Sequence, residues 1–80
     1  MLVTIKYFGM LVESTKLTQE TINISTDTTT IQDLENIVLV KYPTLQNSTY
    51  NIAQNQKIAD KKQRLNNGDE LAFLPPFAGG

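Results

Sequence analysis

The sequence contains neither cysteine nor histidine, and these two absences restrict its chemistry strongly. Without cysteine, the chain cannot form a disulfide, a zinc–thiolate site, a persulfide or a cysteine nucleophile. Without histidine, it lacks the commonest general base and the commonest metal ligand. The sequence also has no Gly-rich phosphate loop, so we expect this chain to bind no ATP, no other cofactor and no metal. An enzyme that acts unaided is improbable with this inventory.

Basic clusters and long apolar runs are scarce as well. The net charge is −1, and the one basic cluster, at residues 61–64, is interpreted as a solvated loop. Nucleic acid is not an expected partner, because phosphate binding requires clustered Lys or Arg. The start of the chain, residues 1–6, is too short and too regularly alternating for a signal peptide, and no apolar run approaches membrane length. We expect a soluble, cytoplasmic protein with no membrane partner.

The first part of the chain predicts two strands. Residues 2–8 and 20–26 alternate between apolar and polar side chains, which is typical of half-buried strands. Gly9 indicates a turn, and a short helical turn is possible at residues 11–13. The two strands would form a hairpin with a long connection. The side of the first strand that we expect in the core consists of Val3, Ile5 and Tyr7.

One helix is predicted over residues 31–41. Two residue pairs resemble a capping box at its start: Thr30 with Asp33, and Thr29 with Gln32. Pro43 should end the helix, because the residue before a proline avoids the helical region. The apolar stripe, at spacings of three and four, consists of Ile31, Leu34, Val38 and Tyr42, widened by Ile37 and Leu39.

The remaining residues predict short strands and turns. Residues 44–49 are polar and turn-like, and strands are expected near residues 50–53, 57–59 and 70–74. Turns are indicated by Asn55-Gln56 and by the Asn-Asn-Gly-Asp run at residues 66–69, since Asn and Gly tolerate positive φ.

This element order predicts an α+β fold of the β-grasp type. A right-handed crossover through the helix would pair the first and last strands in parallel, giving a mixed sheet with one main helix packed across it. We assign residues 1–74 to a single β-grasp domain, since 80 residues suffice for only one. Residues 75–80 would form an extended, flexible C-terminal tail.

The tail itself reads Pro-Pro-Phe-Ala-Gly-Gly. The two prolines fix φ near about −65°, lack N–H donors and end the preceding strand. The Gly-Gly end has no Cβ and is narrow enough to enter a channel in another protein. We therefore interpret the terminal carboxylate of Gly80, with Gly79 before it, as the chemically reactive group. The alternative interpretation is a frayed, Gly-rich terminus.

Residues 65–80 closely resemble the C-terminus of the molybdopterin synthase small subunits, a family of ubiquitin-like β-grasp sulfur carriers. The shared pattern is Leu, two polar residues, Gly-Asp-Glu, a hydrophobic strand, Pro-Pro, two variable residues and Gly-Gly, and Asn55-Gln56 also resembles a step of this family. One departure is Val12, which stands where members often carry an arginine.

The resemblance implies a function for Gly80 and a set of partners. A ubiquitin-activating-type adenylyltransferase would use ATP to adenylate Gly80, and a sulfur donor would convert it to a thiocarboxylate. The large subunit of molybdopterin synthase would hold the active site, where the sulfur passes to cyclic pyranopterin monophosphate in molybdenum cofactor biosynthesis. The resemblance further implies a heterotetramer of two small and two large subunits.

The resemblance also implies which residues contact the large subunit. Phe8, Ile58 and Leu74 would form an apolar contact, and strand parity independently places Phe8 and Leu74 opposite the expected core faces. Scattered surface hydrophobics, or a small second core, are the alternative interpretation of these three residues. The tail would enter the channel of the large subunit through Pro75, Pro76, Phe77 and Ala78, ahead of Gly79 and Gly80.

Two other functions fit the same Gly-Gly end. The chain resembles sulfur carriers of other pathways, such as thiamine synthesis or tRNA thiolation, although thiamine carriers are usually shorter and lack the Pro-Pro step. A ubiquitin-like modifier, joined to lysines through Gly80, belongs to a different class and is not excluded by the sequence.

Overall fold

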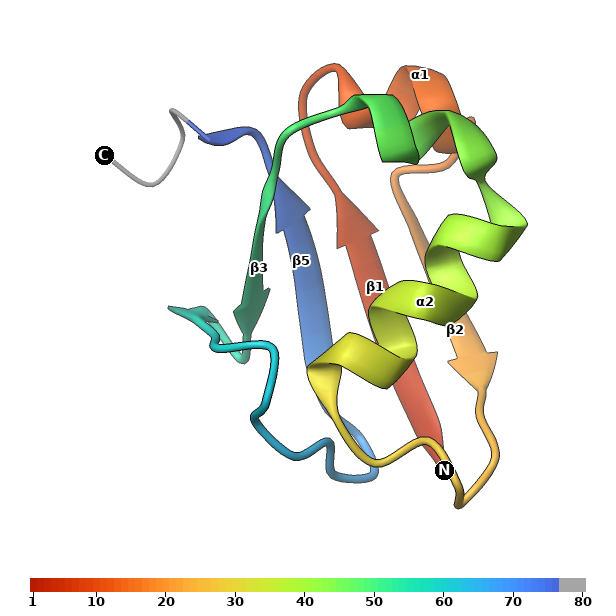
Figure 1. Ribbon diagram of the computed structural model, residues 1–80, viewed down its shortest axis with the longest axis vertical. Coiled ribbons are helices and arrows are strands. Elements are labelled where there is room, and N and C mark those ends of the chain that lie inside the picture. Colours follow the sequence, from red (N-terminus) through yellow and green to blue (C-terminus); the bar gives the residue numbers. More distant parts are fainter. Residues whose placement is uncertain (77–80) are drawn as a thin grey trace.

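The computed structural model describes residues 1–76, which fold into a five-stranded mixed sheet crossed by one main helix (Figure 1). The strand order is β2-β1-β5-β3-β4, with β1 and β5 parallel at the centre and the other neighbours antiparallel. This arrangement confirms the predicted α+β, ubiquitin-like β-grasp fold. The elements are β1 (Leu2–Tyr7), α1 (Leu11–Thr15), β2 (Gln19–Asn23), α2 (Ile31–Lys41), the 3₁₀ helix η1 (Pro43–Asn47), β3 (Asn51–Gln54), β4 (Lys57–Ile58) and β5 (Glu70–Leu74).

Helix α2 begins and ends at the predicted residues. The Thr30 hydroxyl accepts a hydrogen bond from the backbone N–H of Asp33, and the Asp33 carboxylate accepts one from the N–H of Thr30, so the first of the two possible capping boxes is the one present. The N–H groups of the first helical turn also donate to the loop at residues 61–63. These bonds use N–H groups that have no partner within the helix, and they attach the exposed basic loop to α2.

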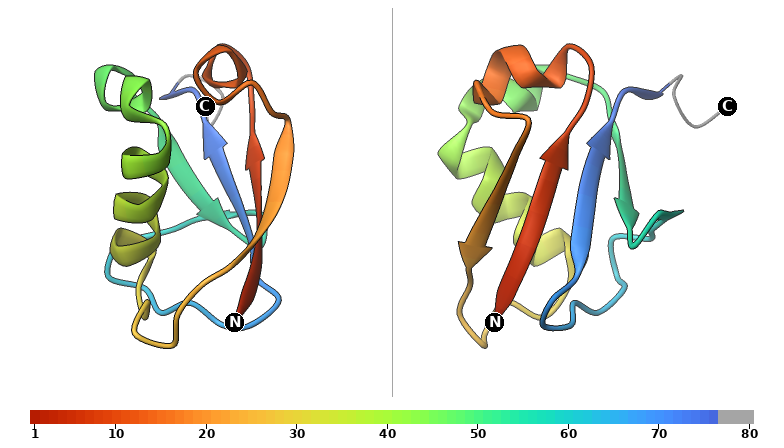
Figure 2. Two further views of the ribbon diagram at one scale, coloured as in Figure 1. Left: turned by 90° about the vertical axis from the view of Figure 1, so that its right-hand side faces the viewer. Right: turned by 180° about the vertical axis from the view of Figure 1, so that it is seen from behind.

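Helix α2 covers one face of the sheet, as the edge-on view in Figure 2 shows. The buried apolar side chains of α2 and of the strands form the hydrophobic core. Alternate residues of β1 and β5 point toward the helix, so strand parity correctly predicted this face. The side chains in the centre of the core, all at most 2% exposed, are Val3, Ile5, Tyr7, Leu11, Ile31, Leu34, Val38, Leu45, Leu71 and Phe73.

Several local predictions were incomplete. The polar segment after Pro43 is not a simple turn: it forms η1, which buries Leu45 completely and closes one end of the core. Ile37 was assigned to the buried stripe of α2, but it is 38% exposed, while Glu35 is buried in the same helix. The second strand ends at Asn23 rather than Thr26, and the helical turn after Gly9 extends to Thr15. Each difference reflects tertiary packing, which the local pattern does not encode.

Candidate functional site

The chain leaves the sheet at the same end as the β1–α1 turn. Because β1 and β5 are parallel, the residues that follow Tyr7 and Leu74 emerge side by side (Figure 1). The backbone N–H of Phe8 donates to the carbonyl of Phe73 at 3.2 Å and extends the pairing by one step. Gly9 then turns the chain with a left-handed φ of 57°, which favours glycine because a Cβ is strained there.

The two prolines of the tail differ in their surroundings. Pro75 is buried and packs beside Gly9, whereas Pro76 is exposed. Pro75 was expected in the tail, and its ring is buried against the folded body. The boundary between domain and tail after Leu74 stays a prediction. The predictions made for Phe77, Ala78, Gly79 and Gly80 lie outside the described residues.

A shallow groove lies on the sheet face opposite α2, and we call it the sheet groove. Its volume is about 430 Å³, and it brings together the three residues for which an apolar contact was predicted, Phe8, Ile58 and Leu74. Seen from behind, this face of the sheet is not covered by a helix (Figure 2). The complete lining is Lys6, Phe8, Ala53, Gln56, Ile58, Glu70, Ala72 and Leu74.

Strand register explains how the sheet groove forms. Ala53 is paired with Ile58 across the β3–β4 hairpin and with Ala72 across β3 and β5, so these side chains share one face. The two alanines are small, and they leave a depression between the larger Phe8, Ile58 and Leu74. Phe8 is 44% and Ile58 is 57% exposed, which makes this an apolar surface of the isolated chain. Sequence reasoning missed Ala53, because its place depends on register.

A buried carboxylate, Asp69, fixes the turn that leads into β5. Its oxygens accept hydrogen bonds from the side-chain amides of Gln54 (2.7 Å) and Asn55 (3.0 Å) and from the backbone N–H of Asn66 (2.8 Å). Burial alone would raise the pKa of Asp69, but these three hydrogen bonds outweigh it and hold the pKa below its usual value. Asn55 of the Asn55-Gln56 step and Asp69 of the Gly-Asp step thus belong to one structural cluster.

The substitution Asp69→Asn should destabilise the fold by about 1–3 kcal/mol, because the new amide would place a donor against donors. Since the folded-state pKa is lowered, the carboxylate stabilises the protein fully above its usual pKa of 3.8, and that contribution is lost as the pH falls through the lowered value. The stability gap between wild type and Asp69→Asn should therefore narrow on acidification. Urea unfolding at several pH values measures it.

The control for this prediction is Asp27→Asn, which makes the same chemical change at an exposed position. Its free energy of unfolding should stay within about 0.5 kcal/mol of wild type. If the difference in the free energy of unfolding between wild type and Asp69→Asn widens below pH 3.8, the assignment of Asp69 as a stabilising carboxylate is contradicted.

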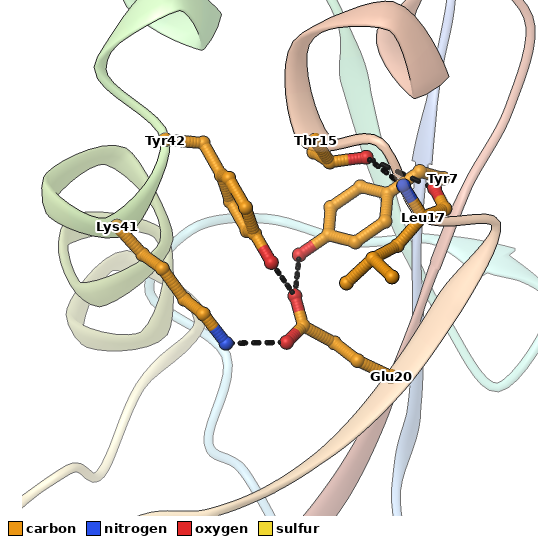
Figure 3. Close-up of polar contacts among 6 residues, drawn as sticks. All are labelled: Tyr7, Thr15, Leu17, Glu20, Lys41 and Tyr42. Carbon is orange, nitrogen blue, oxygen red and sulfur yellow. Dashed lines mark hydrogen bonds and ion pairs between the residues drawn. The ribbon is translucent and has the colours of Figure 1, made fainter.

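A second polar cluster joins the end of α2 to the edge strand β2. Figure 3 shows Glu20 accepting hydrogen bonds from the hydroxyls of Tyr7 (2.8 Å) and Tyr42 (2.7 Å) and from the ammonium group of Lys41. Burial would raise the pKa of Glu20, but the bonds from Lys41, Tyr42 and Tyr7 outweigh it and lower the pKa. Burial, together with the bond to Glu20, raises the pKa of Tyr7, so the phenol remains a donor. This cluster therefore has a structural role, because the Glu20 carboxylate already accepts hydrogen bonds from Tyr7, Lys41 and Tyr42.

Glu35 is, with Asp69, one of the two buried carboxylates among residues 1–76, and it too has partners. It accepts a hydrogen bond from the hydroxyl of Tyr50 at 2.6 Å and forms an ion pair with Lys61 at 3.1 Å. Because Lys61 belongs to the basic loop, this contact fastens that loop to α2. In residues 1–76, no group of three or more His, Cys, Asp or Glu side chains is arranged to hold a metal ion. The sheet groove and the tail that begins beside it remain as the candidate site.

The structure belongs to the ubiquitin-like β-grasp class, as comparison with solved structures shows. A putative molybdopterin converting factor, subunit 1, from Pyrococcus furiosus superposes with a TM-score of 0.86 at 20% sequence identity, covering 94% of this chain and 97% of the other. Small archaeal modifier protein 1 from Haloferax volcanii gives a TM-score of 0.81 at 22% identity, with the same coverage of 94% and 97%. At these identities, the likeness establishes the fold.

The family is established by the sequence. The ThiS family matches residues 5–80, and the chain therefore belongs to this family of ubiquitin-like sulfur carriers. A solved complex of subunits 1 and 2 of the molybdopterin-converting factor from Helicobacter pylori contains a chain with 26% identity, a TM-score of 0.72 and coverage of 100% of both chains. In the described residues, no helix has the length and apolar character needed to span a membrane.

Proposed function

We propose that this chain is the sulfur-carrying small subunit of a molybdopterin synthase. The observation that carries the proposal is the position of the sheet groove, an exposed apolar surface that adjoins the point where the C-terminal segment leaves the sheet. A carrier needs both a reactive tail and a surface by which a partner holds it. The similarity to one chain of the Helicobacter pylori complex supports a large subunit as that partner.

The chemistry assigned to this chain is confined to the carboxylate of Gly80. A carboxylate is a poor electrophile, because its charge is delocalised and its leaving group would be oxide. In the proposed first step, a carboxylate oxygen attacks the α-phosphorus of ATP on an adenylyltransferase of the ubiquitin-activating type, and pyrophosphate leaves. Hydrosulfide, or its equivalent from a sulfur donor, then attacks the carbonyl carbon. The C–S bond forms, the C–O bond to AMP breaks, and a thiocarboxylate remains on Gly80.

The second half of the cycle takes place on the large subunit. The thiocarboxylate sulfur is a soft and strong nucleophile, as thiolates are. It attacks an oxygen-bearing carbon of cyclic pyranopterin monophosphate, where the new C–S bond forms as the C–O bond breaks and the oxygen leaves with the electron pair. Water then cleaves the remaining thioester and regenerates the carboxylate of Gly80. One tail carries one sulfur, so a dithiolene product needs either two loaded carriers or two loadings of one carrier. We propose a heterotetramer of two small and two large subunits as the assembly. We place this cycle in the cytoplasm.

The division of labour between the subunits agrees with the composition of the chain. Cysteine and histidine are absent from its sequence. In the part of the chain that the structure describes, the buried Glu35 and Asp69 and the half-buried Glu20 all accept hydrogen bonds from their own neighbours. The groups that activate ATP, deliver sulfur and bind the pterin would therefore come from the partners. This chain would contribute the tail, its attachment and the docking surface, without binding a cofactor.

Loading and transfer of sulfur test the proposal directly. The purified chain is incubated with an adenylyltransferase of the ubiquitin-activating type, ATP and sulfide, and mass spectrometry follows the replacement of one oxygen by sulfur. The loaded carrier is then mixed with a molybdopterin synthase large subunit and cyclic pyranopterin monophosphate. We expect stoichiometric loading and formation of the dithiolene. A carrier that is loaded but transfers no sulfur to the pterin would direct the assignment to another sulfur pathway, such as thiamine synthesis or tRNA thiolation.

A ubiquitin-like modifier is the second candidate function, favoured by the structural similarity to small archaeal modifier protein 1. In that case, the acyl adenylate of Gly80 would be passed on to the amine of a target lysine, with an amide bond formed and AMP released. Isolation of the tagged chain from cells under denaturing conditions separates the two functions. Proteins joined to Gly80 through lysine would favour the modifier, whereas free chain carrying a thiocarboxylate would favour the carrier.

A further inference from the structure

Gly9 and Pro75 are in contact at the point where the C-terminal segment leaves β5. A Cβ built on Gly9 would lie 2.8 Å from Cγ and 3.8 Å from Cδ of Pro75. The first distance is shorter than any ordinary carbon–carbon contact, whose optimum is roughly 3.5–4.0 Å. The buried ring of Pro75 therefore occupies the space that a side chain at position 9 would need.

The backbone on the Gly9 side of this contact is held in place. The N–H of Phe8 donates to the carbonyl of Phe73 at 3.2 Å, and the N–H of Val12 donates to the carbonyl of Gly9 at 3.2 Å as α1 begins. Leu11, which follows the turn, is 1% exposed and belongs to the core. A methyl group added at position 9 would thus be relieved mainly by movement of Pro75, which lies at the end of the last strand.

Movement of Pro75 would change the direction in which the chain continues. Pro76 follows it at once, and consecutive prolines are stiff over several residues. Gly80 lies only five positions after Pro75, a span of at most roughly 18 Å. A change of direction at Pro75 therefore redirects the chain at the point where it leaves the folded body, ahead of Gly80.

We propose that Gly9 is a positioning residue for the C-terminal carboxylate. By leaving room for the ring of Pro75, it sets the direction of the segment that presents Gly80 to the enzymes acting on it. This inference rests on the proposed function, because it concerns the delivery of Gly80 to an adenylyltransferase. Gly9 acts only through Pro75 and takes no part in the chemistry.

The test compares Gly9→Ala with Gly68→Ala, a matched control. Gly68 also has a left-handed φ, of 87°, but a Cβ there would meet no atom within 4 Å. Both substitutions introduce backbone strain, and only the first collides with Pro75. Since misplacement of a reacting group by about 1 Å can cost roughly 100-fold in rate, we expect kcat for thiocarboxylate formation to fall at least about tenfold in Gly9→Ala. In Gly68→Ala it should stay within about twofold of wild type.

A double-mutant cycle with Pro75→Ala separates the effect of the collision with Pro75 from the effect of backbone strain at position 9. Alanine at position 75 lacks the Cγ and Cδ atoms that the new methyl group would strike, so the effect of Gly9→Ala on kcat should shrink to about twofold or less in that background. The binding constant for the adenylyltransferase, titrated without ATP, should change less than kcat. Thermal unfolding establishes that each variant is folded at the assay temperature. If Gly9 had only a structural role, a variant that is folded at this temperature would keep the wild-type kcat.

Each outcome supports or overturns the inference. Equal kcat values for Gly9→Ala and wild type would overturn it, and so would an undiminished Gly9→Ala effect in the Pro75→Ala background. If Gly9→Ala does not fold, Pro75→Ala alone decides: without its packed ring it should load more slowly, and loading at the wild-type rate would overturn the inference. Failure of wild type itself to be loaded would instead reject the proposed function, and this role with it.

Discussion

Removing Gly80, or adding one residue after it, should abolish sulfur loading while leaving the fold intact. An added residue converts the carboxylate of Gly80 into an amide, which ATP does not adenylate. Deletion keeps a carboxylate, on Gly79, but withdraws it by roughly 3.5 Å, and a displacement of that size should reduce the rate at least about 100-fold. Mass spectrometry of the reaction with adenylyltransferase, ATP and sulfide measures both effects.

The matched control is the extended chain itself. An extension that a specific protease removes, leaving Gly80 as the last residue, should restore loading to the wild-type rate. Circular dichroism and thermal unfolding should show the same folded state for wild type and both variants, because the core lies within residues 3–73. Wild-type loading of either variant would reject the terminal carboxylate of Gly80 as the reactive group.

A charge placed in the sheet groove should weaken binding of this chain to the large subunit that we propose as its partner. Docking removes the apolar surface of Phe8 and Leu74 from water, which is worth roughly 25 cal/mol per Å². Phe8→Asp or Leu74→Asp would instead bury an unpaired carboxylate at the interface. We expect the dissociation constant to rise at least tenfold, which corresponds to about 1.4 kcal/mol. Calorimetric titration of the large subunit with each variant measures this change.

Leu2→Asp is the control for this experiment. Leu2 lies on β1 at the same strand parity as Phe8 and is similarly exposed, 50% against 44%, but it does not line the sheet groove. Its substitution by Asp should leave the dissociation constant within about twofold of wild type. Unchanged binding by both groove variants would show that the partner docks elsewhere. Loss of the folded monomer in Leu74→Asp, whose side chain is half-buried, would leave Phe8→Asp to decide.

Much of the fold was accessible from local patterns. The bounds of α2 followed from the Thr30–Asp33 capping box and Pro43, and those of β5 from the turn before it and its alternation. These signals act over three to five residues, so a single sequence contains them. Leu45 was not assigned to the core, because its neighbours are polar and only the packing of η1 against α1 and α2 gives it a buried place. Glu35 was missed for a similar reason, since Tyr50 and Lys61 come from distant segments.

The sequence by itself determined which side-chain chemistries the chain lacks and which C-terminal motif it carries. The absence of cysteine and histidine, and the Gly-Gly end behind Pro-Pro, are properties of covalent structure that no packing can change. Strand parity also determined that Phe8 and Leu74 lie opposite the core, because alternation is a local property of a strand. The tertiary structure alone decided that Ile58 and the two alanines join them in one groove, since strand order and register bring them together. It likewise decided that Pro75 packs on Gly9, because the parallel pairing of β1 with β5 brings residues from the two ends of the chain to one point.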